Sequence, residues 1–394
     1  MNPIQRPNPT ALRLPAAILG ALLLAGCSTI TGWFSRGDDA AAPAPLTEYA
    51  STVTVAHLWS AGVGAGEART GVRSGPAIAD GRVYATGLGA GVRAFDLRTG
   101  APAWQAPAEG IRLAAAPGVG DGLVVAGGLD GEILALDAGS GAERWRAKVP
   151  VEVVAAPAIG QGAVLVRGSD GRIVAFDAAG GDARWTWAPS APPLTVRGAD
   201  TPVLGPGYVF VGNDDGTVVA LSLQDGRVLW ELPVAQQEGR SELERLADVD
   251  GTPVLEGATL FASSYREQTL AIDAPSGRPI WEQQHGGASR VGVGTDKVVV
   301  SDRAGRVWGL DKATGSAIWQ QEALLRRKLG GVAVLGDHAV VGDFEGYLHW
   351  LRLDTGALAA RVDAGDAIRG APRVADGVLV VQDVEGRVSA YRVQ

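Results

Sequence analysis

The fold is decided by a repeated stretch whose clearest copy is Asp130-Gly131-Glu132-Ile133-Leu134-Ala135-Leu136-Asp137, followed by Gly141 and Trp145. The same order recurs along the chain: an apolar run, an Asp, a Gly four residues later and a Trp four residues after that. The tryptophans in this register are Trp59, Trp104, Trp145, Trp185, Trp230, Trp281 and Trp319. The Gly recurs in seven copies, whereas Ser222 and Arg352 replace the Asp, and Ala360 replaces one Trp. A fixed period of this kind indicates a repeat architecture.

The spacing inside one copy predicts a β-hairpin. An alternating apolar strand ends at the Asp, a short turn closes at the Gly, and the next strand carries the Trp. A further strand and turn lie upstream, so each unit holds four short antiparallel strands, the make-up of one propeller blade. The Asp can accept backbone N–H groups in the turn, and the Trp can fill the seam between neighbouring blades. We therefore assign these residues a structural role rather than a catalytic or ligand-stacking one.

Counting the units predicts a closed ring. An eighth unit begins at Ala371-Pro372 and reaches Tyr391, but the chain ends at Gln394 before a Trp strand. The missing strand is present at the other end, at residues 54–59. Its pairing with the C-terminal strands would leave no open seam. At about 42 residues per blade, we predict an all-β, eight-bladed β-propeller of four-stranded antiparallel blades.

Composition agrees with this fold and excludes other classes. The 394 residues include 56 Gly, which favours many tight turns, and 46% hydrophobic residues, which excludes a disordered chain. The only Cys is Cys27, so no disulfide framework or Cys-rich metal site is expected. The formal net charge is −8, and no basic surface suited to nucleic acid is visible.

The N-terminus explains the single cysteine. Arg6 and Arg13 precede an apolar run at 14–25, which is too short to span a bilayer but suits a secretory signal. The string Leu24-Ala25-Gly26-Cys27 resembles the bacterial lipobox, in which the signal is cut before a Cys that then carries lipid. An ordinary secreted protein with a chance Cys is the alternative. Ser28 rather than Asp follows the Cys, which by resemblance implies the outer membrane, on its periplasmic side.

These features divide the chain into three parts. Residues 1–26 are predicted to be a lipoprotein signal peptide, 27–52 the acylated Cys and a flexible tether, and 53–394 the propeller. The tether is inferred because 28–52 is poor in large apolar residues and carries an Ala-Pro-rich stretch. Cleavage would leave 33 basic and 43 acidic side chains, a formal charge of −10.

The repeat also resembles the tryptophan-docking repeat of pyrroloquinoline-quinone dehydrogenases. Those enzymes hold their quinone against a disulfide of adjacent cysteines and a metal ion. This chain has no Cys pair, and its four histidines (57, 285, 338 and 349) show no metal-ligand spacing. No nucleophile motif or phosphate-binding loop is present either. We therefore expect no catalytic residue, no metal site and no cofactor apart from the covalent lipid on Cys27, and a quinone-dependent dehydrogenase remains the enzyme alternative.

Lipobox, short tether and bare propeller together resemble the BamB family, the propeller lipoproteins of the β-barrel assembly (BAM) machinery. The resemblance covers essentially the whole mature chain. Its specific strings are 193–198 (PLTVRG), 244–250 (ERLADVD) and 341–350 (VGDFEGYLHW). The resemblance implies a non-enzymatic protein that binds the POTRA domains of BamA alongside other BAM subunits. It also implies help in folding and inserting unfolded outer-membrane β-barrel precursors.

Two segments are the candidate contact surface. The 51-residue spacing between Trp230 and Trp281 holds a polar insertion at 236–247, and a Pro-rich stretch follows Trp185. Each would join the outer strand of one blade to the inner strand of the next, so both should emerge on one face. By resemblance, the BamA-contacting positions fall on Leu194, Val196, Arg197, Asp248 and Asp250. The family usually has Leu where this chain has Val196.

Other readings of these features stay open. Arg197 could pair with Asp248 or Asp250 and simply brace two inter-blade loops. The outer blade strands could pair directly with extended precursor strands, as a chaperone would. Trp33 and Trp187 lie outside the docking register and are the candidates for stacking on a saccharide.

Overall fold

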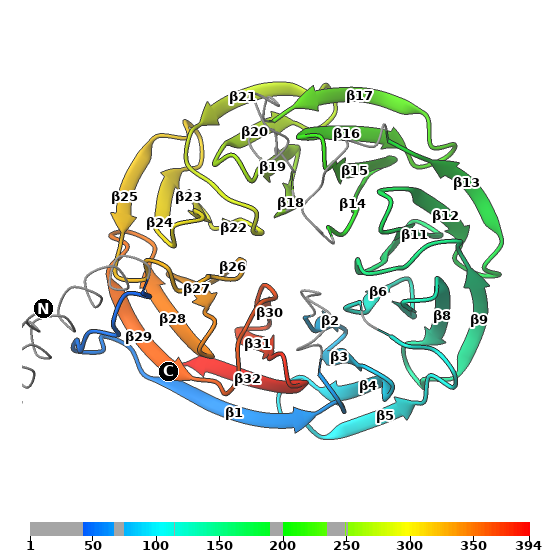
Figure 1. Cartoon of the computed structure of the whole chain (residues 1–394), viewed down its shortest axis with the longest axis horizontal. Coiled ribbons are helices and arrows are strands. Elements are labelled where there is room, and N and C mark those ends of the chain that lie inside the picture. The colour runs from blue at the N-terminus through cyan, green and yellow to red at the C-terminus, as the bar shows by residue number, and fades with distance from the viewer. Residues whose placement is uncertain (1–41, 67–74, 114, 190–199, 235–248, 250) are drawn as a thin grey trace, which may run out of the picture. The chain divides into compact units, whose positions relative to one another are not determined.

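The chain folds into a ring of eight small sheets around a central axis (Figure 1). The structure is a computed structural model that describes residues 42–66, 75–113, 115–189, 200–234, 249 and 251–394. Residues 44–394 form one compact unit. Within the described ranges every regular element is a β-strand, and each sheet has four antiparallel strands. The predicted eight-bladed propeller is confirmed.

Seven blades follow the chain from the axis outward, because each begins with its innermost strand (Figure 1). Blade one consists of β2 (Ala77–Ala79), β3 (Arg82–Gly87), β4 (Gly91–Asp96) and β5 (Pro102–Ala106), and blade two of β6 (Gly118–Gly120), β7 (Leu123–Gly127), β8 (Glu132–Asp137) and β9 (Glu143–Lys148). Blade three consists of β10 (Ala158–Gly160), β11 (Ala163–Arg167), β12 (Ile173–Asp177) and β13 (Ala183–Trp187), and blade four of β14 (Val203–Gly205), β15 (Tyr208–Gly212), β16 (Thr217–Ser222) and β17 (Val228–Pro233). Blade five consists of β18 (Gly251–Glu256), β19 (Thr259–Ser263), β20 (Thr269–Asp273) and β21 (Arg278–Gln283). Blade six consists of β22 (Gly292–Val293), β23 (Lys297–Ser301), β24 (Val307–Asp311) and β25 (Ala317–Gln321). Blade seven consists of β26 (Val332–Leu335), β27 (His338–Gly342), β28 (Tyr347–Arg352) and β29 (Leu358–Asp363).

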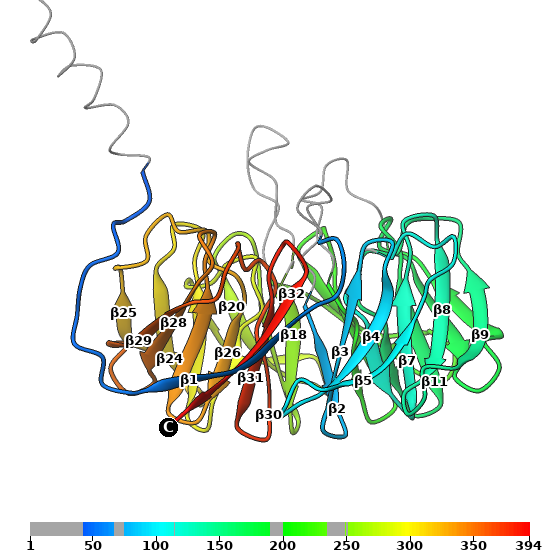
Figure 2. The ribbon, with the colours of Figure 1, turned by 90° about the horizontal axis from the view of Figure 1, so that it is seen from below.

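Blade eight joins the two ends of the chain. It consists of β30 (Arg373–Ala375), β31 (Val378–Gln382), β32 (Arg387–Val393) and, as its outermost strand, β1 (Val55–Gly62). β1 runs antiparallel to β32, with Val55 opposite Val393 and Gly62 opposite Arg387 (Figures 1 and 2). The predicted closure by the N-terminal strand is therefore confirmed.

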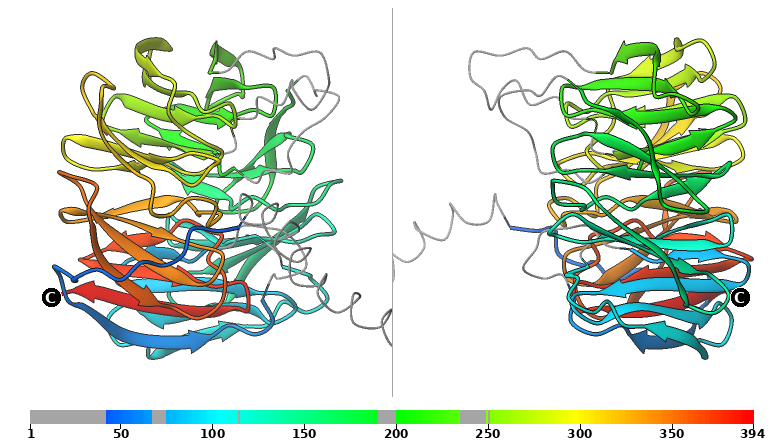
Figure 3. Two further views of the ribbon diagram at one scale, coloured as in Figure 1. Left: turned by 60° about the vertical axis from the view of Figure 1, so that its left-hand side comes forward. Right: turned by 90° about the vertical axis from the view of Figure 1, so that its right-hand side faces the viewer.

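The apolar core lies between neighbouring sheets, whose strands stack face to face around the ring (Figure 3). In the seam between blades two and three, for example, Val125 and Ile133 pack with Val164 and Phe176. The second strand of a blade is covered on both faces, and all five residues of β7 are buried. The outer strands instead alternate between exposed and buried residues, which explains the mixed pattern around each Trp.

Each repeat Trp locks its blade to the next one. The indole ring packs on the turn Gly of the following blade; at Gly226, for instance, a Cβ atom would lie 2.5 Å from the ring of Trp185. The indole N–H donates to a carbonyl of the same turn. These acceptors are Leu97 for Trp59, Ala138 for Trp104, Ala178 for Trp145, Leu223 for Trp185, Ala274 for Trp230, Lys312 for Trp281 and Leu353 for Trp319. The predicted seam role of the tryptophans is confirmed, and it explains why the Gly is kept in every copy.

The turn Asp has the expected role as well. Asp96 accepts the backbone N–H groups of Arg98 and Thr99 at 3.0 and 2.8 Å. Asp311 accepts those of Ala313 and Thr314 at 3.1 and 2.9 Å. A carboxylate at the start of a four-residue turn thus satisfies donors that the strands leave unpaired.

Blade seven departs from the pattern by exchanging two residues. Elsewhere the Trp pairs across the strands with a small residue, such as Ala220 opposite Trp230. In blade seven the large residue is Trp350 on the inner strand, and Ala360 lies opposite it. In blade eight the third and fourth strands are β32 and β1, which no turn joins, so there is no turn Gly on which an outer Trp could dock. Trp350 packs instead at 6.3 Å, edge-on, against Tyr391 of β32.

Candidate functional site

Leu194, Val196, Arg197, Asp248 and Asp250 lie outside the described residues, as do Cys27 and the insertion at 236–247. The strands that flank both segments are described: one segment follows β13 and precedes β14, and the other follows β17 and precedes β18. In both cases an outermost strand is followed by the innermost strand of the next blade, as the repeat predicts (Figure 1).

The described residues that follow each predicted contact segment come together in space. The Thr252 hydroxyl donates to Asp200 at 3.4 Å, and the Thr201 N–H donates to the same hydroxyl at 3.4 Å. Asp200 is 5% exposed. Because residue 200 lies three positions after Arg197 and residue 252 two after Asp250, these bonds connect the entry to blade four with the entry to blade five.

Val249, which lies between the predicted contact positions Asp248 and Asp250, is also held by the propeller. Its side chain is buried in the core between blades four and five, and its N–H donates to the Asn213 carbonyl at 3.1 Å. A Cβ atom on Gly212 would lie 2.7 Å from the carbonyl oxygen of Val249 and 2.8 Å from its side chain, so the glycine makes room for this residue. The chain is therefore anchored between two of the predicted contact positions.

Trp187 is not positioned as a free stacking platform. It lies opposite Ile173 at the end of β13 and packs partly buried on the core between blades three and four. Trp33, the other saccharide candidate, lies outside the described residues. The described part of the chain thus gives no support to a saccharide groove.

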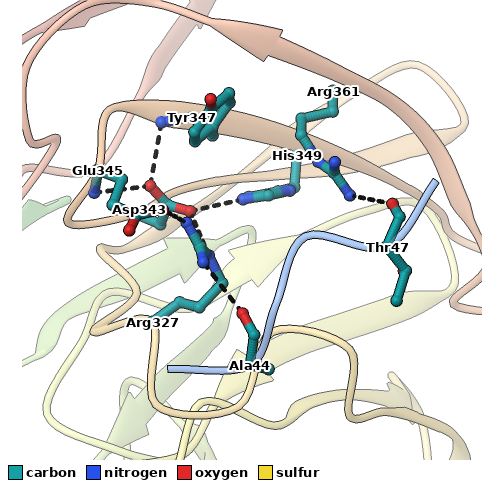
Figure 4. Close-up of polar contacts among 8 residues, drawn as sticks. All are labelled: Ala44, Thr47, Arg327, Asp343, Glu345, Tyr347, His349 and Arg361. Carbon is teal, nitrogen blue, oxygen red and sulfur yellow. Dashed lines mark hydrogen bonds and ion pairs between the residues drawn. The ribbon is translucent and has the colours of Figure 1, made fainter. Parts of the chain in front are cut away.

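A buried polar cluster in blade seven was not predicted. Asp343 is 0% exposed and begins the turn between β27 and β28, where one carboxylate oxygen accepts the N–H groups of Glu345 and Tyr347 at 2.9 and 3.0 Å. Its other oxygen accepts Nε of Arg327 at 2.7 Å and Nε2 of His349 at 2.9 Å (Figure 4). The guanidinium of Arg327 also bonds Glu345. Four donors therefore converge on one buried carboxylate.

The cluster holds Asp343 charged and His349 neutral. Burial alone would raise the pKa of Asp343, but the hydrogen bonds from His349 and Arg327 outweigh it and lower that pKa. Burial lowers the pKa of His349, against the opposing effect of Asp343. Its Nδ1 is buried without a hydrogen-bond partner, so the neutral Nε2–H tautomer fits the site.

An Asp–His pair can serve acid–base chemistry, but this one is closed. His349 and Asp343 are both 0% exposed, so neither can exchange a proton with a bound substrate. In the described part of the chain, no three His, Cys, Asp or Glu side chains are grouped as metal ligands. The cluster is accordingly a structural one.

The cluster fixes the segment that precedes the propeller. Arg327 donates to the Ala44 carbonyl at 3.1 Å, and the Ala44 N–H donates to Leu325 (Figure 4). Farther along, Arg361 donates to the Thr47 carbonyl at 2.9 Å and stacks on the ring of Tyr49. Residues 44–52, here called the strap, are thus held against blade seven. The predicted boundary at residue 53 stays a prediction.

Sequence signals for the strap are weak because most of its bonds use backbone carbonyls. The string at 341–350 does mark His349 as unusual for a blade, whereas the Asp of the same turn recurs as Asp302 in blade six and Asp383 in blade eight. Arg327, the partner of Asp343, lies 16 residues upstream, and no sequence pattern links these two residues.

Within the described residues, no helix is long and apolar enough to span a bilayer.

Comparison with known proteins identifies the family. The family model described as outer membrane protein assembly factor BamB matches residues 88–321 and 309–394. A relative of the same description from Xanthomonas campestris pv. campestris is 54% identical over 395 residues, covering 96% of this chain and 97% of its own. This chain belongs to the BamB family.

Solved structures agree with this assignment. The crystal structure of BamB from Moraxella catarrhalis superposes with a TM-score of 0.78 at 26% identity, covering 86% of this chain and 100% of that one. A quinohemoprotein alcohol dehydrogenase from Pseudomonas putida HK5 superposes with a TM-score of 0.69 at 15% identity, covering 88% of this chain and 78% of that one. The dehydrogenase shares only the fold, so the BamB family, not the enzymes, describes this chain.

Proposed function

We propose that this protein is a non-enzymatic scaffold subunit of the BAM complex. In this role it binds the POTRA domains of BamA, works beside other BAM subunits and assists the folding and insertion of outer-membrane β-barrel precursors. The observation that carries the proposal is the relationship to an outer membrane protein assembly factor over 96% of the chain.

The contact surface is proposed to lie where blades three, four and five meet. Leu194 and Val196 would supply apolar anchors, and Arg197, Asp248 and Asp250 would select partner and orientation. The bonds among Asp200, Thr201 and Thr252 support this, since they bring the two segments' ends together. A bracing role of Arg197 is compatible with the same surface.

Membrane attachment is proposed to run through a lipid on Cys27, which places the protein on the periplasmic side of the outer membrane. The strap begins 17 residues after this cysteine. Because Ala44 is already bonded to blade seven, the free length of the tether would be the part before the strap.

Catalysis by a bound quinone is disfavoured by the sequence. The chain has one cysteine, so the adjacent-Cys disulfide of the quinone dehydrogenases cannot form. Purified protein mixed with pyrroloquinoline quinone and calcium should oxidise no alcohol. Calcium-dependent oxidation of an alcohol would favour the enzyme instead.

Direct strand pairing with precursors is a second candidate, favoured by one observation. The outermost strands of blades four, five and six carry exposed apolar side chains, namely Leu229 (40%), Ile280 (52%) and Ile318 (46%). Each directly precedes a repeat Trp. A photocrosslinker at position 280 would give a ladder of precursor adducts if these strands act as templates. A crosslinker at position 196 should give one discrete BamA adduct if docking is the main role.

Affinity isolation from detergent-solubilised membranes tests the main proposal. The tagged lipoprotein should recover BamA and its partner lipoproteins, and a Cys27→Ser form should lose membrane attachment. Recovery of the protein without BamA would count against the proposal.

A further inference from the structure

The central channel of the propeller has a narrow part that opens into a wider part, whose lining includes several aliphatic side chains. The narrow part is a cavity of about 70 Å³ lined by residues at or just before the start of the innermost strands, among them Thr201, Thr252 and Ser289. The wider part is about 430 Å³. Arg290 and Arg373 line both, so the two are continuous.

Three arginines surround the narrow part. Arg290 precedes β22 of blade six, Arg369 precedes β30 of blade eight, and Arg373 is the first residue of β30. Gly331 of blade seven lies between them; a Cβ atom there would be 2.6 Å from Ala371 and 3.1 Å from the Cβ of Arg290. Glycine at this position therefore lets the cations of blades six and eight approach one another.

These guanidinium groups have no partner within the described structure. No hydrogen bond or ion pair joins the side chain of Arg290, Arg369 or Arg373 to any described residue. The buried arginines elsewhere behave differently: Arg167 pairs with Asp214 at 2.9 Å, and Arg327 with Asp343 at 2.7 Å. Unpaired cations are conspicuous in a chain whose formal net charge is −8.

The channel makes these charges costly unless something neutralises them. Burial, together with the charge of Arg373, lowers the pKa of Arg290 to about 9. Burial also lowers the pKa of Arg373. Arginine side chains stay protonated at neutral pH, and the side chains of Arg290 and Arg373 are partly exposed and line the channel. An anion in the channel would therefore relieve the repulsion between Arg290 and Arg373.

The shape of the channel sets the size of the ligand. A water molecule needs roughly 10–15 Å³ of such space, so the narrow part holds several waters or one carboxylate or phosphate group. Arginine donates to either in a fork of two N–H groups. Asp200 is the acidic residue in the described lining, and it accepts a hydrogen bond from Thr252 where the chain enters blades four and five. Apolar side chains line the wider part: Ile78, Val119, Val254, Val293, Val334 and Val374.

We propose that the channel binds a small organic anion whose carboxylate or phosphate lies between Arg290 and Arg373, with Arg369 beside it and an apolar portion along the wider part. Arg290, Arg369 and Arg373 are not among the residues proposed to contact BamA. It gives the propeller a ligand-binding function in addition to docking.

Titration calorimetry of the purified protein with inorganic phosphate, acetate and hexanoate tests the site. All three should bind and compete for one site. Hexanoate should bind more tightly than acetate, because its alkyl chain reaches the aliphatic side chains of the wider part. The Arg290→Gln, Arg373→Gln double variant should weaken binding by about tenfold or more. Arg227→Gln, an exposed arginine on blade four, is the matched control and should bind as the wild type does.

Thermal unfolding separates loss of the site from loss of the fold. Phosphate should raise the unfolding midpoint of the wild type and of Arg227→Gln, but not that of the double variant, whose midpoint without phosphate should be unchanged or higher. Arg369→Gln alone should give partial loss if the double variant does not fold. Absence of binding to the wild type, equal binding of acetate and hexanoate, or undiminished binding by the variants would overturn the proposal.

Discussion

Asp343 shows how one residue can hold together parts of the chain that are far apart in sequence. It joins Arg327, His349 and two turn N–H groups, and Arg327 in turn holds Ala44 (Figure 4). A buried ion pair of this kind contributes little relative to an apolar replacement, but removing one partner leaves an uncompensated charge. The residue is therefore sensitive to single substitutions.

Asp343→Asn should lower the free energy of unfolding by about 3 kcal/mol, because buried Arg327 would keep only the half-exposed carboxylate of Glu345 as an ionic partner. Urea unfolding followed by tryptophan fluorescence measures this. Asp354→Asn is the control in the same blade. It removes an exposed pair with Arg352 and should change the stability little. Equal losses in the two variants would contradict the structural role given to Asp343.

His349 predicts a pH dependence of stability. Its folded-state pKa is lowered from 6.5, mainly by burial, with Arg361 and Arg327 acting in the same direction and Asp343 opposing. The unfolded chain therefore binds a proton first, and stability falls as the pH drops below 6.5 toward the folded-state pKa.

His349→Gln should reduce this dependence. The unfolding free energy, measured from pH 7.5 to pH 5, should fall less steeply in the variant than in the wild type. Some slope should remain, because burial also lowers the pKa of His285 and His338. Identical slopes in the two proteins would show that His349 does not titrate as described.

At the scale of elements, the seam between blades depends on one Trp and one Gly. Gly226 has φ of +72° and lies under the ring of Trp185, whereas Gly207 of the same blade has φ of +77° with nothing within 4 Å of an added Cβ. The two glycines share the left-handed backbone but not the packing. Gly207 therefore shows the effect of the left-handed backbone alone, and Gly226 shows that effect together with close packing against a ring.

Gly226→Ala should destabilise by about 2–5 kcal/mol, from left-handed strain together with overpacking against the ring. Gly207→Ala should cost only the strain, about 1–2 kcal/mol. Thermal unfolding of the two variants side by side gives the comparison. A larger loss for Gly207→Ala would mean that the Trp contact is not what keeps the repeat glycine.

The repeat made most of the fold predictable, and the departures have physical causes. Blade number, strand order and ring closure follow from the spacing of Asp, Gly and Trp, because that spacing reports a local hairpin. The exchange of Trp350 and Ala360 was visible only as a degraded copy, since its cause is the missing turn at the C-terminus. The Arg327–Asp343 pair and the strap rest on tertiary contacts and backbone carbonyls, which leave no local pattern. The contact residues predicted by resemblance lie outside the described part of the chain and stay predictions.

At the scale of the whole molecule, the ring is closed by β1 and reinforced by the strap. β1 supplies a complete outer strand, with Trp59 docked on blade one. The strap adds four backbone-directed bonds and the stacking of Arg361 on Tyr49. Removal of β1 should therefore destabilise the ring more than removal of the strap.

A chain beginning at Val53 should keep a cooperative unfolding transition and lose roughly 1–3 kcal/mol, since each bond contributes about 0.5–1.5 kcal/mol and release of the ordered segment offsets part of it. A chain beginning at Val63 lacks β1 and should lose the cooperative transition. Differential scanning calorimetry distinguishes the two. A fully stable chain without β1 would contradict the closure of the ring through blade eight.

Direct titration of the purified protein with the POTRA domains of BamA tests the proposed function most closely. The wild type should bind, and Leu194→Ala with Arg197→Ala should weaken binding by about tenfold or more while leaving the unfolding midpoint unchanged. Absence of binding by the wild type, or equal binding by a folded double variant, would contradict docking on BamA through this surface.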